Sequence, residues 1–197
     1  MHYNHTILFI VSVLIALGPN NSTADKIKPP DIPDKAYYLE IDKSERLLRV
    51  KYAGDTYQQF HVASGRGGPG KKQRVGDRRT PEGIYRIAQL NTSRQFHFFI
   101  GLNYPNIEDA RIGFRNDVIS KEEFNQIIES LKYGELPPQN TALGGAIGIH
   151  GIGLETTEKL KMHAHLDWTK GCLALTNTEI SALRRYVSIG TEVIIKE

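Results

Sequence analysis

The sequence predicts a mainly β fold with a few helices, arranged as a β-barrel-like domain or a β-sandwich. Short runs of β-branched and aromatic residues recur between turn residues through the first half of the chain. Helix signals are few and come late, the clearest being two capping boxes that precede apolar stretches. This order of elements is typical of a single β-rich domain to which helices have been added.

The first 24 residues predict a signal peptide or an N-terminal anchor. They contain no Lys, Arg, Asp or Glu, and the apolar run Ile7 to Leu17 is shorter than the roughly 20 residues that span a bilayer. Ser22-Thr23-Ala24 offers the small residues that a signal peptidase reads. We therefore expect an exported chain, located in the periplasm or cell envelope. The weak leading charge leaves an uncleaved, membrane-associated segment as the alternative.

A linker and one folded domain are expected after this segment. Residues 25–35 contain three prolines and alternating charges, a composition that favours an extended linker. The domain is predicted to span residues 36–197, a length sufficient for one hydrophobic core.

Five strands are predicted in the first part of the domain. The turn residues Thr80-Pro81-Glu82-Gly83 open the fourth, since Pro presets φ and Gly can adopt positive φ. The glycine-dense stretch 65–70 matches no phosphate-loop spacing, so we expect a mobile surface loop there. The predicted strands are 37–41, 47–52, 57–63, 84–87 and 96–100.

The second part of the domain mixes helices with strands. Ser120 and Glu123 form a capping box, apolar residues follow on one helical face, and Gly134 stands at the expected C-terminal cap. After a loop at 137–146, a strand is predicted at 147–150. A second capping box, Thr176 with Glu179, begins a helix to about Tyr186, and the β-branched run 191–195 predicts a closing strand.

The charge balance argues against a nucleic-acid partner. The formal net charge is only +3, and near the glycine-rich stretch the tight basic pairs are Lys71-Lys72 and Arg78-Arg79. This density is far below what phosphate neutralisation usually requires.

Cys172 is the only cysteine and therefore cannot form an intramolecular disulfide. A reactive thiol needs a base, a small neighbour that admits substrate, and backbone N–H groups aimed at the oxyanion. Gly171-Cys172 and His150-Gly151 offer candidates for each, provided that segment 152–167 folds back. Taken singly, a buried cysteine and a strand-end histidine are more often structural.

His163 and His165 allow a competing interpretation. With His150 and Cys172 they would supply three nitrogen ligands and one sulfur ligand for zinc. Their spacing matches no zinc signature, and a His-x-His pair on an irregular loop usually faces solvent or substrate. We therefore expect neither a metal nor another cofactor, and retain a zinc hydrolase as an alternative.

Three motifs in combination resemble the YkuD-like L,D-transpeptidase family. They are Thr-Pro-Glu-Gly-x-Tyr at 80–85, Ile-His-Gly at 149–151 and Asp-Trp-Thr-x-Gly-Cys at 167–172. The resemblance covers roughly Tyr37 to Glu197. It implies a β-barrel-like catalytic domain that acts on peptidoglycan stem peptides, with a tetrapeptide as acyl donor and an amine as acceptor.

The resemblance also implies roles for individual residues. Cys172 would be the nucleophile and His150 its base, and the residues expected to form the oxyanion wall or to line the substrate are Gly171, Gly151, Thr169 and Lys170. Lys170 and Ala174 depart from the residues common in the family. These departures leave the acceptor open between a stem amine, water, as in an L,D-carboxypeptidase, and a protein lysine. A non-catalytic wall-binding module is the remaining alternative.

Overall fold

The computed structural model describes residues 37–197. The predicted signal segment at 1–24 and linker at 25–35 therefore lie outside the described residues. Within the described part, none of the helices has both the length and the apolar character that a membrane crossing requires.

Eight strands form one sheet in the order β3-β2-β1-β8-β4-β5-β6-β7. The β1 strand pairs in parallel with β8, and β6 pairs in parallel with β7, whereas the other neighbours are antiparallel. The strands are β1 (Tyr37–Asp42), β2 (Leu47–Tyr52), β3 (Asp55–His61), β4 (Gly83–Ser93), β5 (His97–Leu102), β6 (Gly148–Gly151), β7 (Leu173–Leu175) and β8 (Glu192–Lys196).

The two ends of this sheet meet. Ala63, just beyond β3, forms an antiparallel bridge with Ala174 of β7. The Ala63 N–H donates to the Ala174 carbonyl at 3.0 Å, and the Ala174 N–H returns the bond at 2.8 Å. Because β3 and β7 stand at opposite ends of the strand order, this bridge curls the sheet toward a closed barrel. The predicted mainly β, barrel-like class is confirmed.

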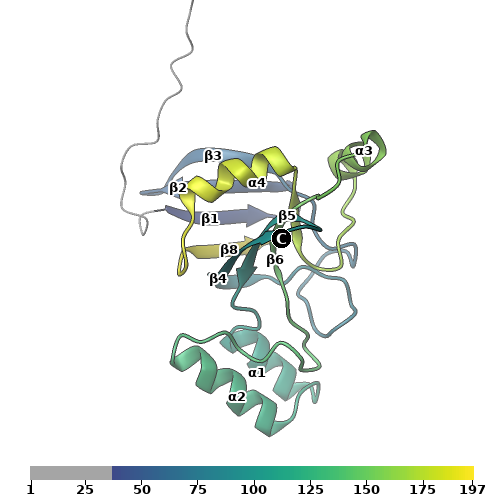
Figure 1. Cartoon of the computed structure of the whole chain (residues 1–197). Helices are drawn as coiled ribbons and strands as arrows, with labels where there is room; N and C mark the ends of the chain where they lie inside the picture. The colour runs from purple at the N-terminus through teal and green to yellow at the C-terminus, as the bar shows by residue number, and fades with distance from the viewer. Residues whose placement is uncertain (1–36) are drawn as a thin grey trace, which may run out of the picture. The chain divides into compact units, whose positions relative to one another are not determined.

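The main core fills the inside of this curled sheet. Alternate residues of each strand point inward, so Leu39 and Ile41 of β1 and Leu48 and Val50 of β2 are fully buried. On one side, α4 (Asn177–Leu183) covers the sheet with Ile180 and Leu183 and continues into the short 3₁₀ helix η1 (Arg184–Tyr186) (Figure 1).

A helical hairpin is inserted between β5 and β6. The helices α1 (Ile107–Arg115) and α2 (Lys121–Lys132) lie below the sheet in Figure 1. They have a small core of their own, in which Ala110, Ile119, Ile127 and Leu143 are buried. The Tyr85 hydroxyl of β4 donates to the Asp109 carboxylate of α1 at 2.8 Å and ties the hairpin to the sheet.

Most predicted elements are present with small shifts of their ends. The helix predicted after Ser120 is α2, and the one predicted after Thr176 is α4 followed by η1. The strand predicted at 84–87 corresponds to β4, which is longer than predicted. Three elements are additional to the prediction: α1, β7 and α3 (Thr157–His165).

The α2 capping box should contribute measurably to stability. Ser120 Oγ accepts the Glu123 N–H at 3.1 Å, and the Glu123 carboxylate accepts the Ser120 N–H at 2.8 Å. We expect Ser120→Ala to lower the free energy of unfolding by about 1 kcal/mol, because a helix N–H loses its acceptor. Urea denaturation would measure the change. Ser130→Ala, later in the same helix, is the control and should be neutral or slightly stabilising.

Candidate active site

The pairing of β6 with β7 brings the two candidate catalytic residues to one place. His150 is in register with Ala174, and Cys172 stands two residues before Ala174. Cys172 stands in the bend that leads into β7, so the register brings its backbone to the same part of the sheet as His150. The thiol of Cys172 donates to the Ala146 carbonyl at 3.3 Å, at the entry to β6.

The His150 ring is held in one tautomer. The residue is buried, and its Nδ1 lies 2.8 Å from the Gly151 carbonyl oxygen. A carbonyl oxygen can only accept, so Nδ1 carries the hydrogen and Nε2 keeps its lone pair. The ring stacks against Phe96 at a centroid distance of 4.3 Å, and Trp168 meets it edge-on at 6.3 Å. These contacts fix the direction of Nε2.

The surroundings of His150, which is buried, and of Cys172, which is half-buried, favour the uncharged form of each side chain. Burial lowers the pKa of His150 below its ordinary value of 6.5 despite the Gly151 hydrogen bond, and the positive charge of Lys159 lowers it further. Burial likewise raises the pKa of the Cys172 thiol above its ordinary value of 9.0, while the Gly148 N–H and the Lys72 charge oppose this rise. Near neutral pH the pair is therefore a thiol and a neutral imidazole.

Two buried hydroxyl groups brace the turn that carries Cys172. Thr169 Oγ1 donates to the Cys172 carbonyl at 2.6 Å and accepts the Gly171 N–H at 3.1 Å. Thr80 Oγ1 approaches the same carbonyl at 3.5 Å and accepts the Gly65 N–H at 2.8 Å. The Gly171 N–H, which we expected in the oxyanion wall, is thus already committed to Thr169. Of the Gly171-Cys172 pair, the Cys172 N–H remains the candidate donor.

The two glycines of the site are required for different reasons. Gly171 has φ of +131°, and a β-carbon there would lie 2.9 Å from the Arg79 carbonyl oxygen. A β-carbon on Gly151 would lie 2.6 Å from the Phe96 carbonyl oxygen and 2.7 Å from Asn177 Oδ1. Gly151 is buried and packed on that side, and its place in the oxyanion or substrate-lining set stays a prediction. Its contribution is the carbonyl that orients His150.

A buried lysine near the thiol was missed by sequence reasoning. Lys72 is only 7% exposed, and its Nζ donates to Asp77 Oδ1 at 2.8 Å and to the Arg74 carbonyl at 2.9 Å. Its charge is the one that favours the Cys172 thiolate. Lys170, which the sequence placed beside Cys172, is exposed instead. Lys72 and Cys172 are distant in the chain, so no local signal could have linked them.

The segment between β6 and β7 differs from the predicted irregular loop. It contains α3, whose C-terminal carbonyls at His163 and Leu166 accept from the Arg46 guanidinium at 3.0 and 2.8 Å. His163 is buried rather than solvent-facing, its Nδ1 accepting from Trp168 Nε1 at 3.4 Å, and His165 is exposed.

The four residues considered for zinc do not converge. The His163 ring packs edge-on against His61 at 5.4 Å, while His150 Nδ1 is engaged by the Gly151 carbonyl. Across residues 37–197, no three His, Cys, Asp or Glu side chains gather closely enough to hold a metal ion.

A separate cavity of about 750 Å³ lies between β4 and the α1–α2 hairpin. Its apolar lining includes Ile84, Ile107 and Leu131, and neither Cys172 nor His150 contributes to it. The candidate catalytic pair is therefore not associated with this cavity.

Comparison with known proteins gives one family and one fold. A family model described as the L,D-transpeptidase catalytic domain, YkuD, matches residues 36–195. The Escherichia coli K12 protein YafK is 31% identical over 112 residues, which cover 53% of this chain and 46% of YafK.

Solved structures show the same fold at lower identity. The helical cell shape determining protein Pgp2 of Campylobacter jejuni has a TM-score of 0.54 at 21% identity, over 82% of this chain and 48% of Pgp2. Bd1075 of Bdellovibrio bacteriovorus has a TM-score of 0.52 at 20% identity, over 82% of this chain and 48% of Bd1075. This chain spans about half the length of these relatives.

The role of Lys72 predicts a change in thiol reactivity. Lys72→Met should raise the pKa of Cys172 further and slow its alkylation by iodoacetamide about three- to tenfold near neutral pH, because the thiolate is the reacting form. Lys72→Arg keeps the charge and should react at nearly the wild-type rate. Lys71→Met, at the exposed neighbour, is the matched control. Equal rates for Lys72→Met and wild type, with both proteins folded by circular dichroism, would refute this role.

Proposed function

The chain belongs to the YkuD L,D-transpeptidase family, and on that basis we propose that it is an exported cysteine acyltransferase acting on peptidoglycan stem peptides. The family as a whole modifies peptidoglycan. The observation that supports the assignment for this chain is the β6–β7 register, in which His150 lies opposite Ala174, two residues after Cys172, while the Gly151 carbonyl engages His150 Nδ1.

In the proposed first half-reaction, Cys172 Sγ attacks the carbonyl carbon of the third residue of a tetrapeptide stem. His150 Nε2 takes the thiol proton as the C–S bond forms, because the neutral pair holds no preformed thiolate. The same proton then passes to the nitrogen of the departing D-alanine as the peptide bond breaks. The product is an acyl-thioester enzyme with a neutral His150.

The oxyanion of the tetrahedral intermediate needs its own donor. We assign the Cys172 N–H to this role in place of the Gly171 N–H, which Thr169 engages. Thr169 and Thr80 hold the Cys172 carbonyl, and this carbonyl and the Cys172 N–H flank the same Cα. Holding the carbonyl therefore also limits the direction of the N–H. Thr169 is thus proposed as a positioning residue, and Lys170 is proposed as part of a substrate-binding surface.

In the second half-reaction an acceptor attacks the thioester. An amine from a neighbouring stem gives a cross-link, water gives L,D-carboxypeptidase activity, and a protein lysine gives anchoring. We propose the stem amine as acceptor, following the family, with hydrolysis as the alternative. Residues 1–24 are proposed to direct the chain to the periplasm or cell envelope, and an uncleaved segment would keep it at the membrane.

Intact-protein mass spectrometry tests the nucleophile. Wild type, incubated with a tetrapeptide-stem muropeptide or a carbapenem, should gain the mass of one acyl group, whereas Cys172→Ala should gain none. His150→Gln should acylate at least about 100-fold more slowly, because the thiol loses its base. His165→Gln, which changes an exposed histidine, is the matched control and should acylate like wild type.

Three outcomes would overturn the proposal. An adduct on Cys172→Ala would exclude Cys172 as the nucleophile. A folded wild type that gains no adduct with either reagent would favour a non-catalytic wall-binding module. Loss of activity on chelation, with His165→Gln also inactive, would favour a zinc hydrolase.

The lowered pKa of His150 predicts the pH dependence of acylation. The base must be neutral to accept the thiol proton, so the rate should fall as pH drops through the His150 pKa. Because that pKa lies below 6.5, the acid limb should have its midpoint below 6.5. Single-turnover acylation measured between about pH 4.5 and 8 gives this midpoint. A midpoint above 6.5 would contradict the buried, neutral histidine described here.

A further inference from the structure

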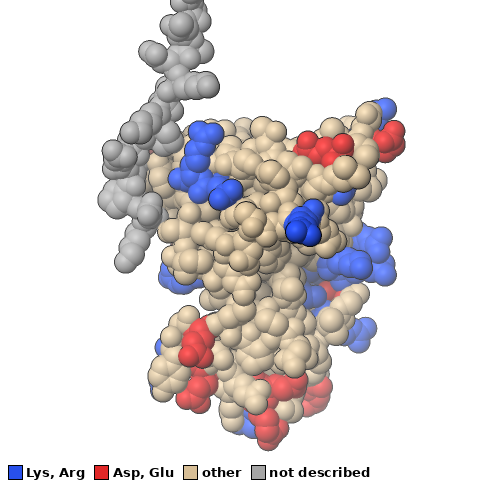
Figure 2. Space-filling view, in the orientation of Figure 1, with Lys and Arg blue, Asp and Glu red and all other residues tan. Residues whose placement is uncertain are grey.

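Residues 65–80, in the loop between β3 and β4, carry a larger net positive charge than the chain as a whole. Residues 65–80 contain six basic side chains and one acidic side chain. Their excess is larger than the net charge of +3 of the whole chain, so the rest of the chain is net negative. In Figure 2, Lys and Arg gather on the right flank, where Figure 1 draws this loop.

This loop is attached to the turn that carries Cys172. At its start, the Arg66 N–H donates to the Thr169 carbonyl at 3.1 Å, and the Thr169 N–H donates to the Ser64 carbonyl at 3.1 Å. At its end, the Arg79 carbonyl lies against Gly171. Both ends of the loop therefore border the turn that carries Cys172.

The one carboxylate of the loop is occupied. Asp77 accepts from Lys72 Nζ at 2.8 Å and from the N–H groups of Gln73, Arg74 and Arg79 at 2.7, 3.1 and 3.1 Å. These bonds hold the pKa of Asp77 below its ordinary value although burial acts to raise it. Asp77 thus compensates the buried Lys72, and no carboxylate of the loop remains for its exposed cations.

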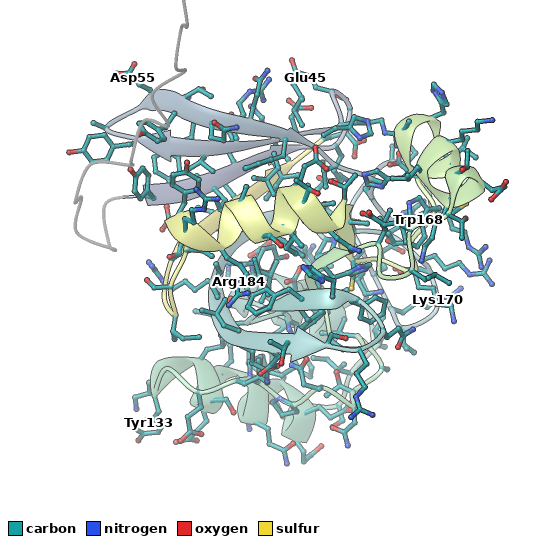
Figure 3. All side chains as sticks on the ribbon, turned by 45° about the horizontal axis from the view of Figure 1, so that its top comes forward. Glu45, Asp55, Tyr133, Trp168, Lys170 and Arg184 are labelled. Carbon is teal, nitrogen blue, oxygen red and sulfur yellow. The ribbon has the colours of Figure 1, made fainter. Side chains whose placement is uncertain are left out.

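The remaining exposed cations form a surface that we call the basic rim: Arg66, Lys71, Arg74, Arg78 and Lys170. Lys170 extends beside Trp168 (Figure 3). Within residues 37–197, none of the five makes an ion pair. On other parts of the protein, Arg49, Arg86 and Arg111 each pair with a glutamate. Unpaired cations clustered beside a nucleophile favour an anionic substrate.

The proposed donor has an anion at the matching position. In a tetrapeptide cleaved after its third residue, the terminal carboxylate lies one residue beyond the scissile carbonyl, or about 3.5 Å along the chain. A donor positioned for attack by Cys172 therefore holds this carboxylate within about one residue's length of Cys172, whose turn the loop borders.

We propose that the basic rim recognises the terminal carboxylate of the stem-peptide donor and so selects donors with a free carboxyl terminus. This inference rests on the proposed function. A carboxylate held by exposed cations is attracted mainly by charge, so recognition should weaken as salt screens the rim over distances of about 8–10 Å. Substrate binding, rather than the chemical step at Cys172, is the property that the rim controls.

The test compares two donors that differ only in this charge. The full chain is given a tetrapeptide stem either as the free acid or as its C-terminal amide, and acylation of Cys172 is followed by mass spectrometry. Wild type should acylate about tenfold faster from the free acid at limiting donor concentration. The double variant Arg74→Gln/Arg78→Gln and the variant Lys170→Gln should each raise KM for the free acid, with kcat and the amide unchanged.

The matched control removes the same charge from another surface. Arg111→Gln/Arg115→Gln on α1 should keep the wild-type preference for the free acid, and added salt should reduce that preference in wild type. Equal acylation of wild type by acid and amide would overturn the inference while leaving Cys172 as the nucleophile. Rim variants that slow both donors equally would also overturn it. If neither the free acid nor the amide acylates wild type, the proposed function is overturned as well.

Discussion

The parallel pairing of β6 with β7 is the constraint on which the rest of the site depends. Parallel neighbours cannot be joined by a tight hairpin, so the chain must leave β6, travel back and enter β7 from the same end. The segment 152–172 makes this return and contains α3, Trp168 and the turn at Gly171. The connection that the sheet requires is therefore also the element that delivers Cys172 to His150.

The segment 152–172 is held in place by contacts of long side chains and has no large hydrophobic core of its own. In α3 itself only His163 is buried, and the Arg46 guanidinium of the β1–β2 turn binds the carbonyls at its C-terminal end. Lys159 lies over the Trp168 ring at 5.7 Å and donates to the Ile152 carbonyl. The wall beside His150 is thus held by charge-assisted hydrogen bonds and aromatic contacts, which are directional and fix orientation more than they add stability.

Much of the fold followed from local patterns, and the missing parts lacked such patterns. The α2 and α4 helices begin with Ser or Thr three residues before Glu, so their starts could be read directly. The buried residues of α1 are Asp109, Ala110 and Gly113, which give no apolar period, and β7 has only three residues. The motifs predicted His150 and Cys172 as a catalytic pair. The effect of Lys72 on Cys172 and the contact of Thr80 with the Cys172 carbonyl became visible only through contacts between distant segments.

The closure of the barrel at Ala63 and Ala174 has a consequence for partial unfolding. This seam consists of two isolated bridges next to Cys172, Ala63–Ala174 and Gly65–Thr169, whereas β1 and β2 are paired along six residues of each strand. Local opening is easiest where the fewest bonds hold a segment. Local opening of the seam would separate β7 from the segment that follows β3 and would shift the Cys172 turn, while the main core stayed intact. The Cys172 turn would then lose its position under milder conditions than those that unfold the core. It would regain that position when the seam closes again, because the core stays folded.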